Sequence, residues 1–406
     1  MRVLLSTIGS RVDLQSILAL AAKLKELGQD ARICAPPDFR EWVESFGISF
    51  VPIGQAVRQT ANRPVAAQSR PTPEQLRQLM EKTIAGQFAA ITAAANGCDV
   101  LVAGMSLQFA IGSVAEWMHV AHVYAAWCPV TLPSPHHAPP PLPSVSTDDT
   151  VDNQTLWARD AQRWNDNFGA ALNSSRASLG LAPVRDVRSH LFTDRPWLAA
   201  DPVLGPWIKT ADLDVVQTGA WMMQDQRHMS AELEAFLDAG EAPVYFGFSS
   251  MSAPQNLSQA MLAAARENGR RAIVSRGWAE VVPPNHEPDC LSIGEENLQA
   301  LFRRVAAVVH HGGAGTTTIA AMTGVPQVVV PQIWDQHYWA QRVQQLGIGT
   351  AHAPGAPSAA SLTEALRLSL HPDVAARARS IAGTVRTDGA EVAARLLIDE
   401  ASRGTR

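Results

Sequence analysis

The chain has 406 residues, of which 46% are hydrophobic, and a formal net charge of -5 at pH 7. This length exceeds the usual size of one hydrophobic core, so two domains are expected, and the lack of a long basic run argues against nucleic acid as a partner. The four cysteines form no Cys-x-x-Cys pair, and the sequence shows neither a signal peptide nor a long apolar segment. We therefore expect a cytoplasmic protein with no disulfide framework, no zinc site and no stable membrane insertion.

In the first half, the hydrophobic pattern alternates between strand and helix. Residues 3–7 predict a buried strand, a short loop then reaches Asp13, and residues 17–27 repeat apolar side chains at helical spacing. The same rhythm returns at residues 99–103 and 109–118. Such alternation predicts parallel strands joined by right-handed crossovers, which is a Rossmann-like unit of the α/β class.

Two irregular stretches interrupt this first half. Residues 55–70 mix alanine, glutamine and arginine without a clear period, and residues 131–150 are rich in proline, serine and histidine. The second stretch holds too much proline for a central strand or helix. We expect both to be surface loops, of the kind that often holds a substrate.

The strand and helix rhythm restarts after a linker. Residues 200–221 carry two prolines, two glycines and little helical pattern, which is typical of a connection between domains. The elements expected after the linker are residues 244–248, 257–267, 271–275, 326–330, 338–346, 357–369 and 390–402. The sequence thus predicts a domain at residues 1–214 that includes the linker, and a second at residues 215–406 from which one late helix crosses back onto the first.

The most informative motif is the run His-His-Gly-Gly-Ala-Gly-Thr-Thr-Thr at residues 310–318, between a predicted strand and a predicted helix. Its glycines leave backbone N–H groups uncovered, and a helix N-terminus carries about half a positive charge, so the loop can hold a diphosphate without a lysine. The run fits neither a Walker P-loop nor a dinucleotide fingerprint. A tight strand-to-helix turn that binds nothing stays open as the alternative.

Asp335 and Gln336 follow the next predicted strand and therefore lie at the same carboxyl edge of the sheet. Ligands of open α/β sheets bind at this edge. A carboxylate and an amide provide the acceptors and the donor that several sugar hydroxyls require. Taken alone, Asp335 is better explained as a helix cap, but beside the glycine loop it indicates a nucleoside diphosphate sugar.

With these motifs the chain resembles, nearly end to end, the inverting glycosyltransferases of family 1. It is most similar to the vancomycin-group glycopeptide glycosyltransferases. The resemblance rests on residues 1–7, 9–11, 34–37, 200–202 and 217–221, together with the glycine loop and the Asp335-Gln336 pair. It implies the GT-B fold, in which two Rossmann-like domains face each other across a cleft, the first binding the acceptor and the second the nucleotide sugar.

The resemblance also implies a donor site. The first histidine of the loop and the loop amides are expected to hold the diphosphate, and Asp335 with Gln336 the sugar. Trp278 is a candidate to stack on the nucleotide base, with burial in the core as the alternative. The donor-binding residues so expected are Ser10, Arg11, Ser249, Arg276, Trp278, Glu296, Asn297, His310, Gly312, Gly313, Gly315, Thr316, Asp335 and Gln336.

The catalytic base that the resemblance implies is Asp13. Its carboxylate would take the proton of an acceptor hydroxyl while that oxygen attacks the anomeric carbon from the side opposite the diphosphate, so the configuration would invert. The alternative is a helix cap, whose hydrogen bonds would lower the pKa of Asp13 and weaken it as a base. His122, His136 and His137 remain alternative bases. Trp127, His136 and His137 are also expected to line the acceptor site.

The sequence therefore predicts a hexosyltransferase of antibiotic biosynthesis that moves a hexose or deoxyhexose from a UDP- or dTDP-sugar to an aromatic natural product. A glycopeptide aglycone, a polyketide and a phenol are all open as acceptors, and O- and C-glycosylation are not distinguished. No cofactor or metal is expected, because the helix start, the loop amides and His310 offset the charge of the leaving group. A nucleotide-sugar epimerase and a noncatalytic nucleotide-sugar-binding helper of the same fold are the alternatives. The oligomeric state is not predicted.

Overall fold

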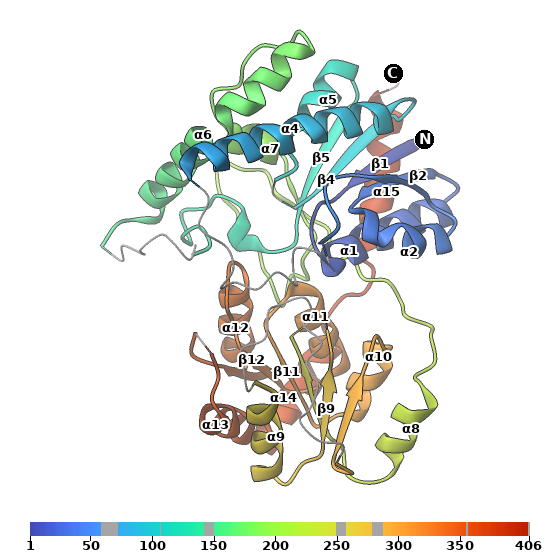
Figure 1. Ribbon diagram of the computed structural model, residues 1–406, viewed down its shortest axis with the longest axis vertical. Coiled ribbons are helices and arrows are strands. Elements are labelled where there is room, and N and C mark those ends of the chain that lie inside the picture. The colour runs from blue at the N-terminus through green and yellow to red at the C-terminus, as the bar shows by residue number, and fades with distance from the viewer. Residues whose placement is uncertain are drawn as a thin grey trace.

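The computed structural model describes residues 1–57, 72–105, 107–141, 150–248, 257–277, 287–354 and 356–404. Within these residues the chain forms two units, each a parallel sheet with helices packed against it (Figure 1). The two Rossmann-like units expected from the sequence are confirmed. Among the described residues, no helix is long and apolar enough to cross a bilayer.

The first sheet has the strand order β3-β2-β1-β4-β5-β6-β7. In β1, Leu4 packs into the core on one face of the sheet, and Val3 and Leu5 pack into the core on the other face. This explains why parallel strands buried on both faces read as continuous apolar runs. The strands are β1 (Arg2–Ser6), β2 (Asp30–Ala35), β3 (Ser49–Pro52), β4 (Val100–Gly104), β5 (Ala121–Ala126), β6 (Trp197–Leu198) and β7 (Val216–Gln217). The helices of this unit are α1 (Arg11–Glu26), α2 (Arg40–Ser45), α4 (Pro73–Ala95), α5 (Ile111–Met118), α6 (Asn153–Ser178) and α7 (Val187–Phe192), with 3-10 turns η1 (Pro37–Phe39) and η3 (Pro129–Thr131).

The second sheet has the order β10-β9-β8-β11-β12-β13. Its central strand β11 is also buried on both faces, since Val308 and Val309 belong to different core clusters. The strands are β8 (Val244–Gly247), β9 (Ala272–Ser275), β10 (Cys290–Ile293), β11 (Ala307–His310), β12 (Gln327–Val329) and β13 (Gly349–Ala351). The helices are α8 (Ala231–Asp238), α9 (Leu257–Glu267), α10 (Leu298–Leu301), α11 (Ala314–Thr323), α12 (Gln336–Gln345), α13 (Ala359–Ser369) and α14 (Pro372–Ala382), with η4 (Phe302–Arg304). The last helix, α15 (Gly389–Gly404), follows them in the chain but belongs to the first unit.

Each sheet reverses its strand order at one point, between β1 and β4 in the first and between β8 and β11 in the second. Ligands of open α/β sheets bind outside the carboxyl ends of the strands at such a switch point. Strand β1 leads into α1, and β11 leads through the glycine loop into α11. The topology therefore places both segments that the sequence singled out at the switch point of their own sheet.

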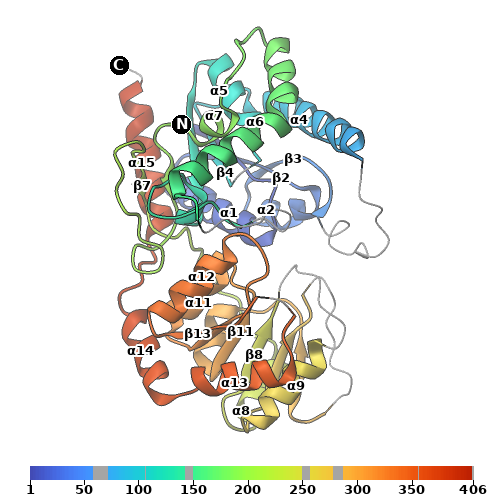
Figure 2. The ribbon, with the colours of Figure 1, turned by 90° about the vertical axis from the view of Figure 1, so that its left-hand side faces the viewer.

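The chain passes twice between the two units. At the first passage Trp221 packs in the core of the first unit, and Met222 packs against the core of the second. At the second passage the chain returns to the first unit as α15 (Figure 2), which packs on α1. The two passages touch, because a Cβ atom on Gly389 would overlap the backbone of Gly219.

The structure differs from two expectations, on the domain boundary and on the start of the first helix, and describes the irregular stretches only in part. The first sheet continues to Gln217 in β7, past the expected boundary at residues 214 and 215, so we propose to place the boundary after Trp221. Helix α1 begins at Arg11, which puts Asp13 in its first turn and not in the preceding loop. The irregular stretches lie in part outside the described residues, at 58–71 and 142–149.

Candidate active site

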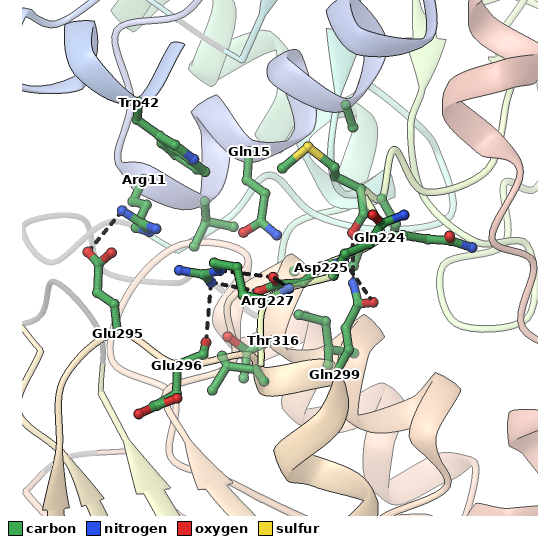
Figure 3. A pocket seen from close by; sticks show the side chains of 18 of the residues that line it. Arg11, Gln15, Trp42, Gln224, Asp225, Arg227, Glu295, Glu296, Gln299 and Thr316 are labelled. Atoms are coloured by element: carbon green, nitrogen blue, oxygen red, sulfur yellow. Dashed lines mark hydrogen bonds and ion pairs between the residues drawn. The ribbon is translucent and has the colours of Figure 1, made fainter. Parts of the chain in front are cut away.

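A cavity of about 1650 Å³ lies between the two units (Figure 3). Helix α1 contributes Arg11 and Gln15, the segment after the first passage contributes Asp225 and Arg227, and α11 contributes Thr316. The volume exceeds the roughly 300–1,000 Å³ of common small-molecule pockets, so the cavity has room for a large ligand.

Two arginines are fixed in this cavity by acidic partners. Arg11 of the first unit forms an ion pair with Glu295 of the second at 2.9 Å, and its guanidinium lies over the ring of Trp42, 4.1 Å from the centroid. Arg227 binds Asp225 through two hydrogen bonds of 2.9 and 2.6 Å (Figure 3). Paired guanidinium forks of this kind are well ordered and suit the recognition of phosphate or carboxylate.

The glycine loop presents the start of α11 with no side-chain cap. The N-cap residue is Gly313, and the hydroxyls of Thr317 and Thr318 donate back to carbonyls of the loop and the first turn, at 3.0 and 2.8 Å. Gly312 has φ +93°, and a Cβ atom there would lie 2.7 Å from Val329 Cγ1, so the position requires glycine. The first-turn N–H groups and the nearby Thr316, which lines the cavity, form an arrangement suited to an anion.

His310 points into the protein. Its side chain is fully buried, Nδ1 accepts the backbone N–H of Gly312 at 3.1 Å, and Nε2 lies 2.9 Å from Gln327 Oε1. Burial lowers the pKa of His310 to about 3, so the ring is neutral and Nε2 donates to Gln327. Both ring nitrogens are thus used to hold the loop, which does not agree with the expectation that His310 donates to a phosphate.

The neighbouring His311 has the better geometry for that role. A Cβ atom on Gly313, the N-cap of α11, would lie 2.8 Å from His311 Nε2, so the ring lies against the start of the helix. Its Nδ1 is buried and has no hydrogen-bond partner among the described residues. Burial lowers the pKa of His311 to about 4, so the ring enters the site as a neutral donor.

Asp13 is held by residues of its own turn and by a distant tryptophan. Its Oδ2 accepts the backbone N–H of Ser10 at 2.6 Å and the Ser10 hydroxyl at 3.0 Å, and its Oδ1 accepts the indole N–H of Trp127 at 3.1 Å. A Cβ atom on Gly9 would overlap the carboxylate. Burial raises the pKa of Asp13 despite these hydrogen bonds, so the helix-cap geometry and a raised basicity occur together.

Asp335 approaches Asp13 from the other unit. It precedes α12, and its Oδ2 accepts the indole N–H of Trp339 at 3.1 Å. Burial raises the pKa of Asp335 to about 6, and the charge of Asp13 contributes to this shift. Gln336 is buried, and its Oε1 accepts the backbone N–H groups of residues 332 and 333, so this oxygen shapes the loop.

Two of the expected donor-site residues organise the segment after the first passage. Asn297 is only 5% exposed, caps α10, and donates from Nδ2 to the carbonyls of Asp225 and Arg227 at 2.9 and 2.7 Å. The carboxylate of Glu296 accepts the backbone N–H of Ser230 at 3.2 Å, and Glu296 also lines the cavity. The side-chain amide of Asn297 is therefore occupied by the protein itself.

The other expected donor-site residues have different positions. Arg276 and Gly315 line the cavity, whereas Ser10 forms the N-cap of α1 and contacts Asp13. Ser249 and Trp278 lie outside the described residues. No sequence motif pointed to Trp42, Glu295, Asp225 or Arg227, because only the fold brings these segments to one cavity.

The expected acceptor-site residues are not gathered in one place. Trp127 is 5% exposed and packs edge-on against Trp221, with ring centroids 5.1 Å apart, so its ring is not presented for stacking on an acceptor. His136 is exposed, and His137 lies edge-on to Trp157 and Trp207.

The alternative base His122 is placed far from the switch point. It is the second residue of β5, at the amino end of the strand, whereas the cavity lies at the carboxyl edges of the sheets. Burial lowers the pKa of His122 to about 4. This position excludes direct contact with a ligand bound where α1 and α11 begin.

No group of three or more candidate metal ligands occurs among the described histidine, cysteine, aspartate and glutamate residues. The Asp-x-Asp motif of Asp212 and Asp214 lies in the stretch before β7, and Asp214 forms an ion pair with Arg195 at 3.3 Å.

Comparison with known proteins gives matches along the whole chain. The glycosyltransferase family 28 N-terminal domain matches residues 3–130, and the C-terminal domain of the erythromycin biosynthesis protein CIII-like family matches residues 285–395. The vancomycin aglycone glucosyltransferase of Amycolatopsis orientalis is 49% identical over 406 residues, which cover 99% of this chain and 98% of the relative. The dTDP-epi-vancosaminyltransferase of the same organism is 44% identical over 410 residues, covering 99% and 98%.

Solved structures share the fold at lower identity. The crystal structure of the kitacinnamycin glycotransferase superposes with a TM-score of 0.74 at 18% identity and covers 98% of both chains. The glycosyltransferase VinC in complex with dTDP superposes with a TM-score of 0.69 at 19% identity and covers 99% of this chain and 100% of its own.

Proposed function

Because the chain belongs to glycosyltransferase family 1 and has the GT-B fold, we propose that it moves a hexose or deoxyhexose from a UDP- or dTDP-sugar to a glycopeptide aglycone hydroxyl, with inversion. As a member of this family it is a hexosyltransferase, so neither the epimerase nor the noncatalytic helper is retained. The two relatives named above differ in the sugar that their names give, so both kinds of donor are kept in the proposal. The glycopeptide acceptor is preferred over a polyketide or phenol because these relatives cover nearly the whole chain.

The observation that carries the proposal is the meeting of two helix starts from different units. A Cβ atom on Gly315 of α11 would lie 3.0 Å from Val12 Cγ1 of α1. Asp13 follows Val12 in the first turn of α1, so its carboxylate belongs to the helix start that meets the uncapped first turn of α11. A sugar bound at this junction has a base on one side and an anion-binding helix start on the other, which is what an inverting displacement requires.

The donor diphosphate is proposed to bind the first-turn N–H groups of α11, with Thr316 and His311 as side-chain donors. His310 supports this site indirectly, because it fixes the Gly312 backbone. The helix start offsets the charge that develops on the leaving diphosphate, so the proposed reaction needs no metal. Arg11 and Arg227 are proposed to contact the remainder of the nucleotide, since both line the cavity.

Asp13 is proposed to act as the base. The acceptor hydroxyl gives its proton to the carboxylate, the hydroxyl oxygen forms the bond to the anomeric carbon, and the diphosphate leaves with the electron pair of the broken bond. The raised pKa of Asp13, caused by burial, increases its affinity for that proton. Asp335 is proposed to bind sugar hydroxyls from the opposite side of the junction.

Mass spectrometry of reaction mixtures tests the transfer. The enzyme is incubated with UDP-glucose or dTDP-glucose and with a vancomycin-type aglycone, an aromatic polyketide or a simple phenol, and Asp13→Asn provides the background. We expect a hexose adduct on the aglycone with the wild-type enzyme. If no acceptor gains a sugar while calorimetry shows that the nucleoside diphosphates bind, these sugars and acceptors are not its substrates.

A further inference from the structure

The indole of Trp127 is the contact that connects the Asp13 carboxylate to the core of the first unit. Trp127 directly follows β5, and its Nε1 donates to Asp13 Oδ1 at 3.1 Å across 114 positions of sequence. The other oxygen, Oδ2, accepts both bonds from Ser10. A carboxylate oxygen has two lone pairs, so Oδ1 is the atom that keeps room for a further proton.

The surroundings of Trp127 prevent its ring from turning away. A Cβ atom on Gly104 of β4 would lie 3.1 Å from Trp127 Cζ2, so the ring packs directly over the neighbouring strand. On another side it meets Trp221 edge-on at 5.1 Å. Trp221 is itself fixed, because its indole N–H donates to Thr218 Oγ1 at 2.9 Å and its ring packs against Trp197.

We propose that Trp127 is a positioning residue for the transfer reaction, whose indole N–H holds Asp13 so that Oδ1 faces the acceptor hydroxyl. This inference rests on the proposed role of Asp13 as the base. Ser10 fixes one oxygen through the helix start, and Trp127 fixes the other through the core, so the two contacts together hold the carboxylate plane against rotation. The proton from the acceptor then arrives at the oxygen whose second lone pair is open.

The hydrogen bond from the Trp127 indole also changes the pKa of Asp13, which packing of the ring alone would not do. A hydrogen bond from Trp127 stabilises the ionised carboxylate, and it lowers the pKa of Asp13 against the larger, raising effect of burial. Loss of the bond therefore raises the pKa of Asp13. Because the base acts in its ionised form, the acidic limb of the activity profile moves to higher pH.

The test compares two substitutions in the same aromatic cluster. Trp127→Phe keeps most of the buried ring but removes the donor to Asp13. Trp221→Phe removes a similar volume and the bond to Thr218, and Trp221 makes no hydrogen bond to Asp13. With Trp127→Phe we expect kcat to fall about tenfold, the donor KM to stay within about twofold, and the acidic limb to move to higher pH.

Trp221→Phe is expected to lower the melting temperature while leaving the acidic limb in place. If both variants shift the limb alike, or neither does, Trp127 has a packing role only. Asp13→Asn separates this result from the proposed function: an active Asp13→Asn enzyme contradicts the base itself, whereas an inactive one with an unchanged Trp127→Phe profile contradicts only the positioning role.

A measurement on enzyme without the Trp127 substitution keeps the test decisive if Trp127→Phe does not fold. In protein labelled with ¹⁵N-tryptophan, the indole signal of Trp127 is expected to shift as Asp13 titrates, and this titration is expected to vanish in Asp13→Asn. If every indole signal titrates with pH in Asp13→Asn as it does in the wild type, the contact does not exist in solution and the inference fails.

Discussion

The carboxylates of Asp13 and Asp335 interact electrostatically across the domain interface, each held by an indole N–H at 3.1 Å. The two residues lie at the starts of α1 and α12, which belong to different units. Burial raises the pKa of both carboxyl groups. Two acidic groups kept in this way are costly to the fold and suited to a reaction that moves a proton.

Replacement of the proposed base gives a direct prediction. Asp13→Asn keeps the shape of the side chain but cannot accept a proton, and its single amide oxygen can accept from Trp127 or from the Ser10 backbone, not from both. We expect kcat to fall by about 10²–10⁴, since general base catalysis contributes about that much, while the calorimetric Kd for UDP or dTDP stays within about twofold. Asp30→Asn, at an exposed position in β2, is the matched control. Wild-type turnover by Asp13→Asn contradicts the assignment.

Asp335 predicts a dependence of stability on pH. Its pKa is raised from 3.8 to about 6 in the folded protein, so the folded state binds the proton more tightly than the unfolded chain. The stability that this proton gives is present below the unfolded pKa and is lost as the pH rises through the folded pKa. The side chain of Asp335→Asn does not titrate, so this variant does not lose stability as the pH rises. Its free energy of unfolding should exceed that of the wild type by at most about 3 kcal/mol above pH ~6, and the two should be equal at pH ~4.

Urea unfolding at several pH values measures this difference. The exposed Asp373→Asn variant serves as the control and should follow the wild type at every pH. A constant difference between Asp335→Asn and the wild type across the whole range would show that the buried carboxylate is not the cause. Turnover by Asp335→Asn should fall even where its stability rises, because the residue is proposed to bind the sugar.

The two adjacent histidines are expected to respond differently. His310→Gln should lower the free energy of unfolding by about 1–3 kcal/mol, because it breaks the buried link between Gln327 and Gly312. His311→Asn should leave stability nearly unchanged and raise the Kd for the nucleoside diphosphates about tenfold. Each variant controls for the other. A strong loss of affinity in a fully folded His310→Gln enzyme would restore the role expected from the sequence.

Arg227 tests whether the segment after the first passage takes part in donor binding. Arg227→Gln should raise the Kd for the nucleoside diphosphates about tenfold, since a bond between a guanidinium and an anion is lost. Arg304→Gln removes a similar ion pair, with Asp238, at a site that does not line the cavity. Equal affinities of the two variants in calorimetry would remove Arg227 from the donor site.

Chelation tests the proposal that the helix start replaces a metal. Turnover should be retained in excess EDTA and should not rise when Mg²⁺ or Mn²⁺ is added back, because the α11 N–H groups already offset the diphosphate charge. Activity that is lost in EDTA and restored by one of these cations would contradict this account.

The parts of the fold that follow from periodic burial could be predicted from the sequence. Helix α9 occupies residues 257–267 as expected, and β1 lies within one residue of its predicted range. The predicted start of α1 was six residues too late: the apolar repeat already includes Leu14, three residues before Ile17, and the helix begins at Arg11. Capping by Ser10 and Asp13, not hydrophobic spacing, begins this helix.

The sequence motifs predicted which segments form the site, but not how their side chains are oriented. The glycine loop and Asp335 could be recognised because each follows a predicted strand, but the orientation of the side chains depends on packing. His310 and His311 are neighbours at the end of β11 and therefore point in different directions, and the sequence does not say which one faces the core. The bond between Trp127 and Asp13 joins residues 114 positions apart, so it exists only in the folded chain.

The most direct test of the account is proton NMR of the anomeric centre in the product formed from an α-linked nucleotide sugar and the glycopeptide aglycone. Attack opposite the diphosphate predicts a β-linked sugar on an aglycone hydroxyl. An α-linked product would contradict a single displacement assisted by Asp13, and the junction of α1 and α11 would then need another mechanism.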